Sequence, residues 1–151
     1  MKIINRQARF QYRVIETLEA GIVLTGAEVK SVRNQRVDLA AGFARIQKSE
    51  LYLKNVMIFP YNGQTAEEYN PRRDRKLLIH RRQINTLTGK LSQGSFTLIP
   101  LSIYDQHNLI KVELGLVESK TKIDKRRQIK QRDEDRQLER DLHKIKLEDS
   151  K

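Results

Sequence analysis

Clustered basic side chains are the groups in this chain that are best suited to bind a charged partner. Guanidinium and ammonium groups bind phosphates, and together with short polar groups they suit structured RNA, which is recognised largely by shape. For any single member, an ordinary solvated surface charge is the alternative. The clusters precede the first expected strand, follow a predicted helix start and surround a long loop: Asn5, Arg6, Arg9, Lys30, Arg33, Arg72, Arg73, Arg75, Lys76, Arg81 and Arg82.

The overall charge agrees with a phosphate-binding role. The chain has 30 basic and 19 acidic residues, a net charge of +11. Residues 1–118 carry a net +7 and residues 119–151 a net +4, so both parts are cationic. This distribution favours nucleic acid as the partner, although net charge says nothing about the fold.

Residues for catalysis or metal binding are scarce. The chain has no cysteine, no G-x-S-x-G motif and no glycine-rich phosphate loop. Its three histidines are His80, His107 and His143, and none has Asp or Glu at metal-ligand spacing. Glu16, Glu19 and Glu28 could form the metal site of a nuclease, but solvated or salt-bridged carboxylates are far commoner among so many arginines. We therefore expect no enzyme activity, no metal and no cofactor.

Residues 119–151 predict a tail without a core of its own. They hold 12 basic and 8 acidic residues, no aromatic residue and few large apolar ones, too little to offset the entropy of ordering. A basic residue recurs every four positions and would line one helix face: Arg132, Arg136, Arg140 and Lys144. Like charges at this spacing oppose a helix, whereas i, i+3 pairs from Asp133 to Arg136 and from Asp141 to Lys144 would support one. We expect a disordered or helical tail that becomes ordered on RNA, with a solvated extension without a role as the alternative.

Residues 1–118 predict one domain dominated by strands. Alternating or apolar runs indicate strands near 10–14, 22–24, 42–48, 51–59, 76–80, 96–104 and 108–117. A short helix should follow Thr25, whose spacing to Glu28 forms a capping box, and we expect Glu28 to cap rather than to bind a substrate. A second helix is expected around Ile84, Leu87 and Leu91, ended by glycines 89 and 94, after a polar loop over 61–75.

The number of strands predicts the fold class. Six or seven short strands with two or three short helices suit a small OB-like antiparallel barrel better than a sandwich. The N-terminus lacks the apolar run of a signal peptide, and no stretch approaches the roughly 20 apolar residues of a membrane span. We expect a cytoplasmic monomer.

Several motifs together resemble the SmpB family of SsrA-binding proteins, which act in bacterial trans-translation. The string EAGIVLTGAEVKS at 19–31 is long and order-specific, and the other motifs are NRQAR at 5–9, Asn70-Pro71, RKLL at 75–78 and DKR at 124–126. The resemblance covers nearly the whole chain.

The resemblance implies an OB-type barrel that binds the tRNA-like domain of transfer-messenger RNA and delivers this RNA to stalled ribosomes. The family's RNA-binding residues on the barrel fall on Asn5, Glu19 and Leu78, although Leu78 would otherwise pass for a core residue. In the family the tail becomes helical in the empty message channel beyond the decoding centre of the small subunit. Asp124, Lys125 and Arg126 match the triplet that the family needs for accommodation and tagging.

Two departures from the family pattern concern stacking on bases. The family usually has Gly and then a His or an aromatic residue just before the triplet, where this chain has Ser119 and Ile123. Ile123 offers at most an apolar contact, whereas Phe10, where the family often has His, can still stack. An OB-type ribosomal RNA-binding or ribosome-assembly factor is the competing function, and a metal-dependent nuclease is the third.

Overall fold

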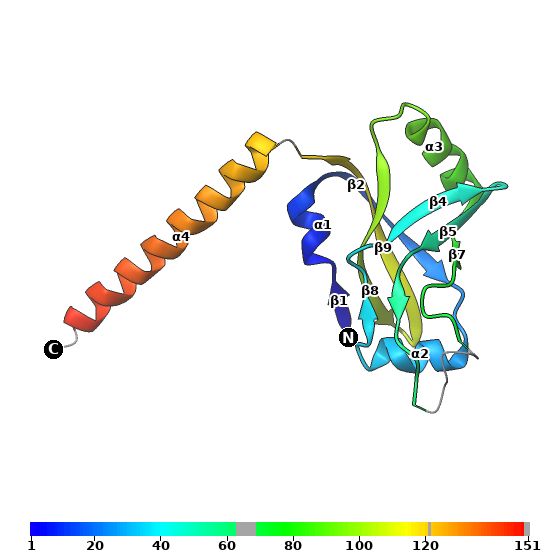
Figure 1. Ribbon diagram of the computed structural model, residues 1–151, viewed down its shortest axis with the longest axis horizontal. Coiled ribbons are helices and arrows are strands. Elements are labelled where there is room, and N and C mark those ends of the chain that lie inside the picture. The colour runs from blue at the N-terminus through cyan, green and yellow to red at the C-terminus, as the bar shows by residue number, and fades with distance from the viewer. Residues whose placement is uncertain (63–68, 121, 150–151) are drawn as a thin grey trace. The chain divides into compact units, whose positions relative to one another are not determined.

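The computed structural model describes residues 1–62, 69–120 and 122–149 of the chain, and it divides into two units (Figure 1). The first unit is Met1–Ser119 and the second is Lys120–Lys151. The first unit is mainly β, as the sequence predicted, and carries short helices. The second unit contains a single helix within its described residues.

The elements of the first unit follow one another closely. Its strands are β1 (Lys2–Ile4), β2 (Tyr12–Ile22), β3 (Val37–Asp38), β4 (Phe43–Gln47), β5 (Glu50–Lys54), β6 (Met57–Ile58), β7 (Arg75–Leu78), β8 (Thr97–Gln106) and β9 (Leu109–Ser119). Its helices are α1 (Arg6–Gln11), α2 (Gly26–Arg33) and α3 (Arg81–Leu91). The helix of the second unit is α4 (Lys122–Asp149).

Seven of the described strands form one antiparallel sheet in the order β1-β8-β4-β5-β7-β2-β9. β8 also pairs with β9, so the sheet curls back toward itself. Two of the strand pairings are short. β4 pairs with β8 through the single residue pair Ala44 and Leu98, and β7 pairs with β2 through two residue pairs. The expected OB-like barrel is therefore realised as a strongly curved sheet that does not close into a regular barrel.

Tight two-residue loops connect the two best-defined hairpins. Lys48 and Ser49 link β4 to β5 with φ of 50° and 61°, and His107 and Asn108 link β8 to β9 with φ of 51° and 64°. Positive φ at both central positions matches the twist of the flanking strands. The first loop lies one residue before residues 49–50, the gap between the strands predicted near 42–48 and 51–59.

Three local predictions were wrong. Phe10 lies in α1 and not in a strand, because the buried cap at Asn5 starts a helix there. The strand predicted over 51–59 breaks at Asn55, which has a φ of 58°. Gly89 lies inside α3, whereas Gly94, with a φ of 81°, follows its end.

Two apolar clusters stabilise the first unit. The larger one fills the concave side of the sheet and includes Leu51, Leu98, Val112 and Leu114, all almost fully buried. A smaller cluster joins Ala8 of α1 to side chains from the other face of β8 and β9: Ile99, Leu101 and Val117. α1 therefore covers part of the outer face of the sheet.

Candidate nucleic-acid interface

Asn5 is a buried structural residue that holds α1 in place. Its side chain is 4% exposed, and its amide nitrogen donates to the carbonyl oxygens of Leu39 (3.1 Å) and Pro100 (2.9 Å). Its Oδ1 accepts from the backbone N–H of Ala8 at 3.1 Å and so caps α1. These contacts favour an indirect role for Asn5 in RNA binding. Asn5 anchors α1, and this helix carries the exposed residues Arg6 and Arg9.

A row of outward-facing residues crosses four strands of the sheet. Leu78 of β7 pairs with Gly21 of β2, Gly21 with Lys111 of β9, and Lys111 with Tyr104 of β8. Leu78 is 53% exposed, so the interpretation of this position as a core residue is wrong and its surface is available to a partner. A Cβ added at Gly21 would lie 3.3 Å from the Cβ of Leu78, so glycine keeps the backbone accessible beside it. We call Leu78, Gly21, Lys111 and Tyr104 the outer row.

Glu19 lies beside this row and is held by two of its members. Its carboxylate accepts a hydrogen bond from Lys111 Nζ at 2.6 Å and another from the hydroxyl of Tyr104. The hydrogen bond from Lys111, followed by that from Tyr104, lowers the pKa of Glu19. Burial and the hydrogen bond to Glu19 raise the pKa of Tyr104 to about 12. Glu19 thus stays ionised and holds Lys111 in place, across Gly21 from Leu78.

Two further predicted body residues, Lys76 and Lys30, lie on different elements. Lys76 of β7 is exposed between two buried neighbours and donates to Glu50 at 3.1 Å. Lys30, in the last turn of α2, lies with its Nζ 5.2 Å from the ring centroid of Tyr61. Lys76 therefore shares the outer face with Leu78, whereas Lys30 extends the cationic surface toward α2.

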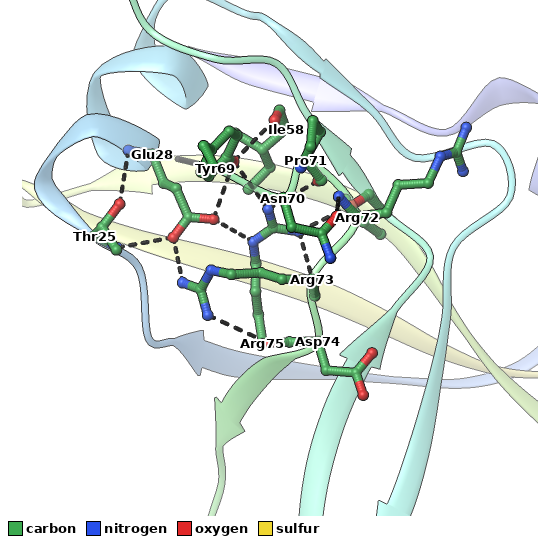
Figure 2. Close-up of polar contacts among 11 residues, drawn as sticks. Thr25, Glu28, Ile58, Tyr69, Asn70, Pro71, Arg72, Arg73, Asp74 and Arg75 are labelled. Carbon is green, nitrogen blue, oxygen red and sulfur yellow. Dashed lines mark hydrogen bonds and ion pairs between the residues drawn. The ribbon is translucent and has the colours of Figure 1, made fainter. Parts of the chain in front are cut away.

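Glu28 caps α2, as predicted, and it is also the centre of a buried ionic network that the sequence did not reveal (Figure 2). Its carboxylate accepts from the Thr25 N–H at 3.0 Å, from Arg75 Nε at 2.5 Å and from the Arg73 guanidinium. Burial alone would raise its pKa, but the hydrogen bonds from Arg73, Thr25 and Arg75 outweigh this effect and lower the pKa to about 2. The network fastens the segment that precedes β7 to α2.

Arg75 is therefore not a surface residue for phosphate. It is fully buried, and its remaining donors reach the carbonyl oxygens of Val56, Arg73 and Pro71 and the hydroxyl of Tyr69 (Figure 2). The sequence grouped Arg73 and Arg75 with the phosphate-binding cluster because charge alone does not tell a buried arginine from an exposed one. In the sequence, the Asn70-Pro71 turn a few residues before Arg75 was a sign that this segment is ordered.

The predicted tail residues lie along α4. Asp124, Lys125 and Arg126 occupy its first turns, and the four-residue basic series of Arg132, Arg136, Arg140 and Lys144 follows on exposed positions. The side chain of Ile123 lies outside the described residues. The expected pairs from Asp133 to Arg136 and from Asp141 to Lys144 do not form ion pairs in this described helix; Lys130 lies 4.0 Å from Glu134, and Gln137 donates to Asp141 at 3.1 Å.

The described residues hold neither a metal-binding cluster nor a membrane-spanning helix. In residues 1–62, 69–120 and 122–149, no three His, Asp or Glu side chains gather in a way that could hold a metal ion. None of the helices in this part of the chain has the length and apolar character needed to cross a lipid bilayer. A curved antiparallel sheet with exposed basic side chains on α1 and β7 is typical of small, mainly β proteins of the nucleic-acid-binding class.

Comparison with known proteins identifies the family. The family model of the SmpB protein matches residues 2–144. An SsrA-binding protein of Thermosynechococcus vestitus is 50% identical over 138 residues, which cover 90% of each chain, and one of Enterococcus faecalis is 46% identical over 91% of this chain and 90% of its own. A solved structure described as "tmRNA-SmpB: a journey to the center of the bacterial ribosome" matches with a TM-score of 0.68 and 45% identity, covering 80% of this chain and 85% of that one. This chain belongs to the SmpB family.

Proposed function

We propose that this protein binds the tRNA-like domain of transfer-messenger RNA and delivers that RNA to stalled ribosomes for trans-translation, without catalysing a reaction. Its relatives are named SsrA-binding proteins, and the matching solved structure concerns tmRNA and SmpB in the bacterial ribosome. The site of action is the cytoplasm, where ribosomes translate.

The observation that carries this proposal beyond the relatives' names is the exposed outer row with Glu19 beside it. Leu78 presents an apolar contact next to an open backbone at Gly21, and Lys111 adds an ammonium group that Glu19 holds in place. A folded RNA offers the matching groups, since it has phosphates, 2'-hydroxyls and base edges within a few ångströms of one another. Arg6, Arg9, Lys30 and Lys76 extend the cationic surface around the row.

The tail has a separate role in this proposal. Residues 119–151 bind the ribosome, with Asp124, Lys125 and Arg126 near the decoding centre and the basic series of α4 in the message channel. A helix whose exposed basic residues recur every four positions suits a channel lined with phosphate, because the phosphates cancel the repulsion between like charges. Ile123 would supply an apolar contact in place of the family's usual stacking residue.

A gel-shift comparison tests this function. The protein should bind transfer-messenger RNA in preference to ribosomal RNA fragments of equal length, with an affinity that falls as salt rises. A chain ending at Ser119 should keep this binding and lose tagging in a reconstituted translation assay. Equal binding to both RNAs would contradict the proposal.

A further inference from the structure

Phe43 and Arg45 of β4 form an aromatic and cationic pair that the proposed function does not use. The guanidinium carbon of Arg45 lies 5.5 Å from the centroid of the Phe43 ring, a distance at which a cation and an aromatic face attract each other. Phe43 is half-buried and Arg45 is exposed. No carboxylate among the described residues lies within ion-pair distance of Arg45, so its charge is not neutralised as those of Arg33 and Arg73 are.

This pair borders a groove between α1 and β4. The groove has a volume of about 360 Å³, within the range of sites that hold small ligands. All its walls belong to the first unit. Its lining residues include Gln11, Tyr12, Phe43, Arg45, Thr97 and Ile99.

The chemistry of the groove fits one unpaired nucleotide. Two half-buried aromatic side chains, Tyr12 and Phe43, line the groove, and stacking of a base on such a ring is largely independent of base identity. The amide of Gln11 and the hydroxyl of Thr97 can bond to a base edge. Arg45 supplies the positive charge that the attached phosphate requires.

The register of the sheet joins this groove to the proposed RNA surface. Arg45 pairs with Tyr52 of β5, and Tyr52 pairs with Lys76 of β7. Neighbouring strands are about 4.8 Å apart, so the backbones at Arg45 and Lys76 lie about 10 Å apart across the sheet. One folded RNA can therefore contact Lys76 and reach the groove.

We infer that the groove between α1 and β4 binds one unpaired nucleotide of the tRNA-like domain, with its base on Phe43 and Tyr12 and its phosphate at Arg45. This inference rests on the proposed function, because it assigns the groove to the same RNA that the outer row binds. It adds a stacking contact to a surface that otherwise offers mainly charge and polar groups.

The test uses two substitutions that keep charge and approximate volume. In the full-length protein, Phe43→Leu removes the ring and Arg45→Lys removes the planar guanidinium. Matched controls are Phe59→Leu and Arg36→Lys, because Arg36 also lies over an aromatic ring, 6.0 Å from the centroid of Phe59, but outside the groove. Filter binding measures the affinity for the isolated tRNA-like domain, and dimethyl sulfate or 2'-hydroxyl acylation maps the protected nucleotides.

Phe43→Leu should weaken binding about 5- to 150-fold, the range expected for loss of one stacked base. Arg45→Lys should weaken it by a smaller factor, and both controls should remain within about twofold of the wild type. One unpaired nucleotide should lose protection in both groove variants while the other protections persist, a result that partial unfolding would not produce. Melting curves check that Arg45→Lys, at an exposed position, folds normally.

Unchanged affinity and unchanged protection in both groove variants would overturn the inference. So would variants that bind the tRNA-like domain normally but bind ribosomes poorly, because the groove would then serve ribosomal RNA. A wild-type protein with no preference for the tRNA-like domain would contradict the proposed function itself, so the two failures are distinguishable.

Discussion

The buried carboxylate of Glu28 provides the sharpest test of how the first unit is held together. Glu28→Gln keeps an oxygen that can accept the Thr25 N–H, so the cap on α2 can persist, but it removes the negative charge beside Arg75. Both side chains of this ion pair are fully buried. The substitution therefore leaves a buried guanidinium without a counter-ion, and such changes cost about 3 to 5 kcal/mol.

The pKa of Glu28 gives a second route to the same magnitude. The pKa falls from an ordinary 4.5 to about 2 on folding, and at about 1.4 kcal/mol per pKa unit this corresponds to about 3 kcal/mol at pH 7. Because the folded-state pKa is the lower one, this stabilisation is fully present above pH 4.5 and is lost as the pH falls toward 2. About 40% of it should remain at pH 3.

Urea unfolding followed by circular dichroism measures this effect at pH 7, 4 and 3. At pH 7 the variant should be less stable than the wild type by about 3 kcal/mol, and the difference should shrink as the pH falls. Glu50→Gln is the matched control, because Glu50 also accepts hydrogen bonds from Tyr52 and Lys76 but lies at the surface, and it should change stability little. A pH-independent difference, or one as small as that of the control, would refute the assignment of the network as the main ionic support of this unit.

Three further outcomes follow from packing and exposure. Gly115→Ala should destabilise the protein by about 1 to 3 kcal/mol in thermal melts, because the added Cβ would lie 2.8 Å from Cδ1 of Leu101. Gly89→Ala should instead raise stability by up to about 1 kcal/mol, because nothing lies within 4 Å of its added Cβ. A loss of stability in both variants would contradict this prediction. Asn5→Ala should lower the free energy of unfolding by about 1 to 3 kcal/mol and weaken RNA binding, because α1 is displaced. Thermal melts and gel shifts on the same variant measure the two effects. A loss of binding without a loss of stability would indicate that Asn5 contacts the RNA directly. Leu78→Ala should weaken binding to the tRNA-like domain while the melting temperature stays nearly constant, because the side chain is 53% exposed; a large drop in melting temperature would show a structural role.

Local patterns were predicted best where the interacting groups are close in sequence. The capping box from Thr25 to Glu28 was predicted correctly, since both partners lie within one helical turn. The strands β8 and β9 were also predicted, because apolar and polar side chains alternate over 108–117. The helix α1 was missed, since its cap at Asn5 is held by carbonyl groups of Leu39 and Pro100, which lie 34 and 95 residues away.

The candidate site, too, was predicted from the sequence only in part. The resemblance pointed to Glu19 and Leu78, but only the strand register places Lys111 and Tyr104 beside them. Neighbouring residues of the same charge also differ in burial. Lys76 is exposed on β7, whereas Arg75, the residue before it, is fully buried.

The amino-acid sequence by itself determined the mainly β class, the cationic character of both parts of the chain, the cap of α2 and membership of the SmpB family. These properties depend on composition, on periodicity over a few residues and on the order of residues in motifs. The tertiary structure alone decided which charges are buried, how α1 is anchored and which side chains share the outer face. Burial and cross-strand contact join residues far apart in the chain, and they depend on the register and curvature of the whole sheet.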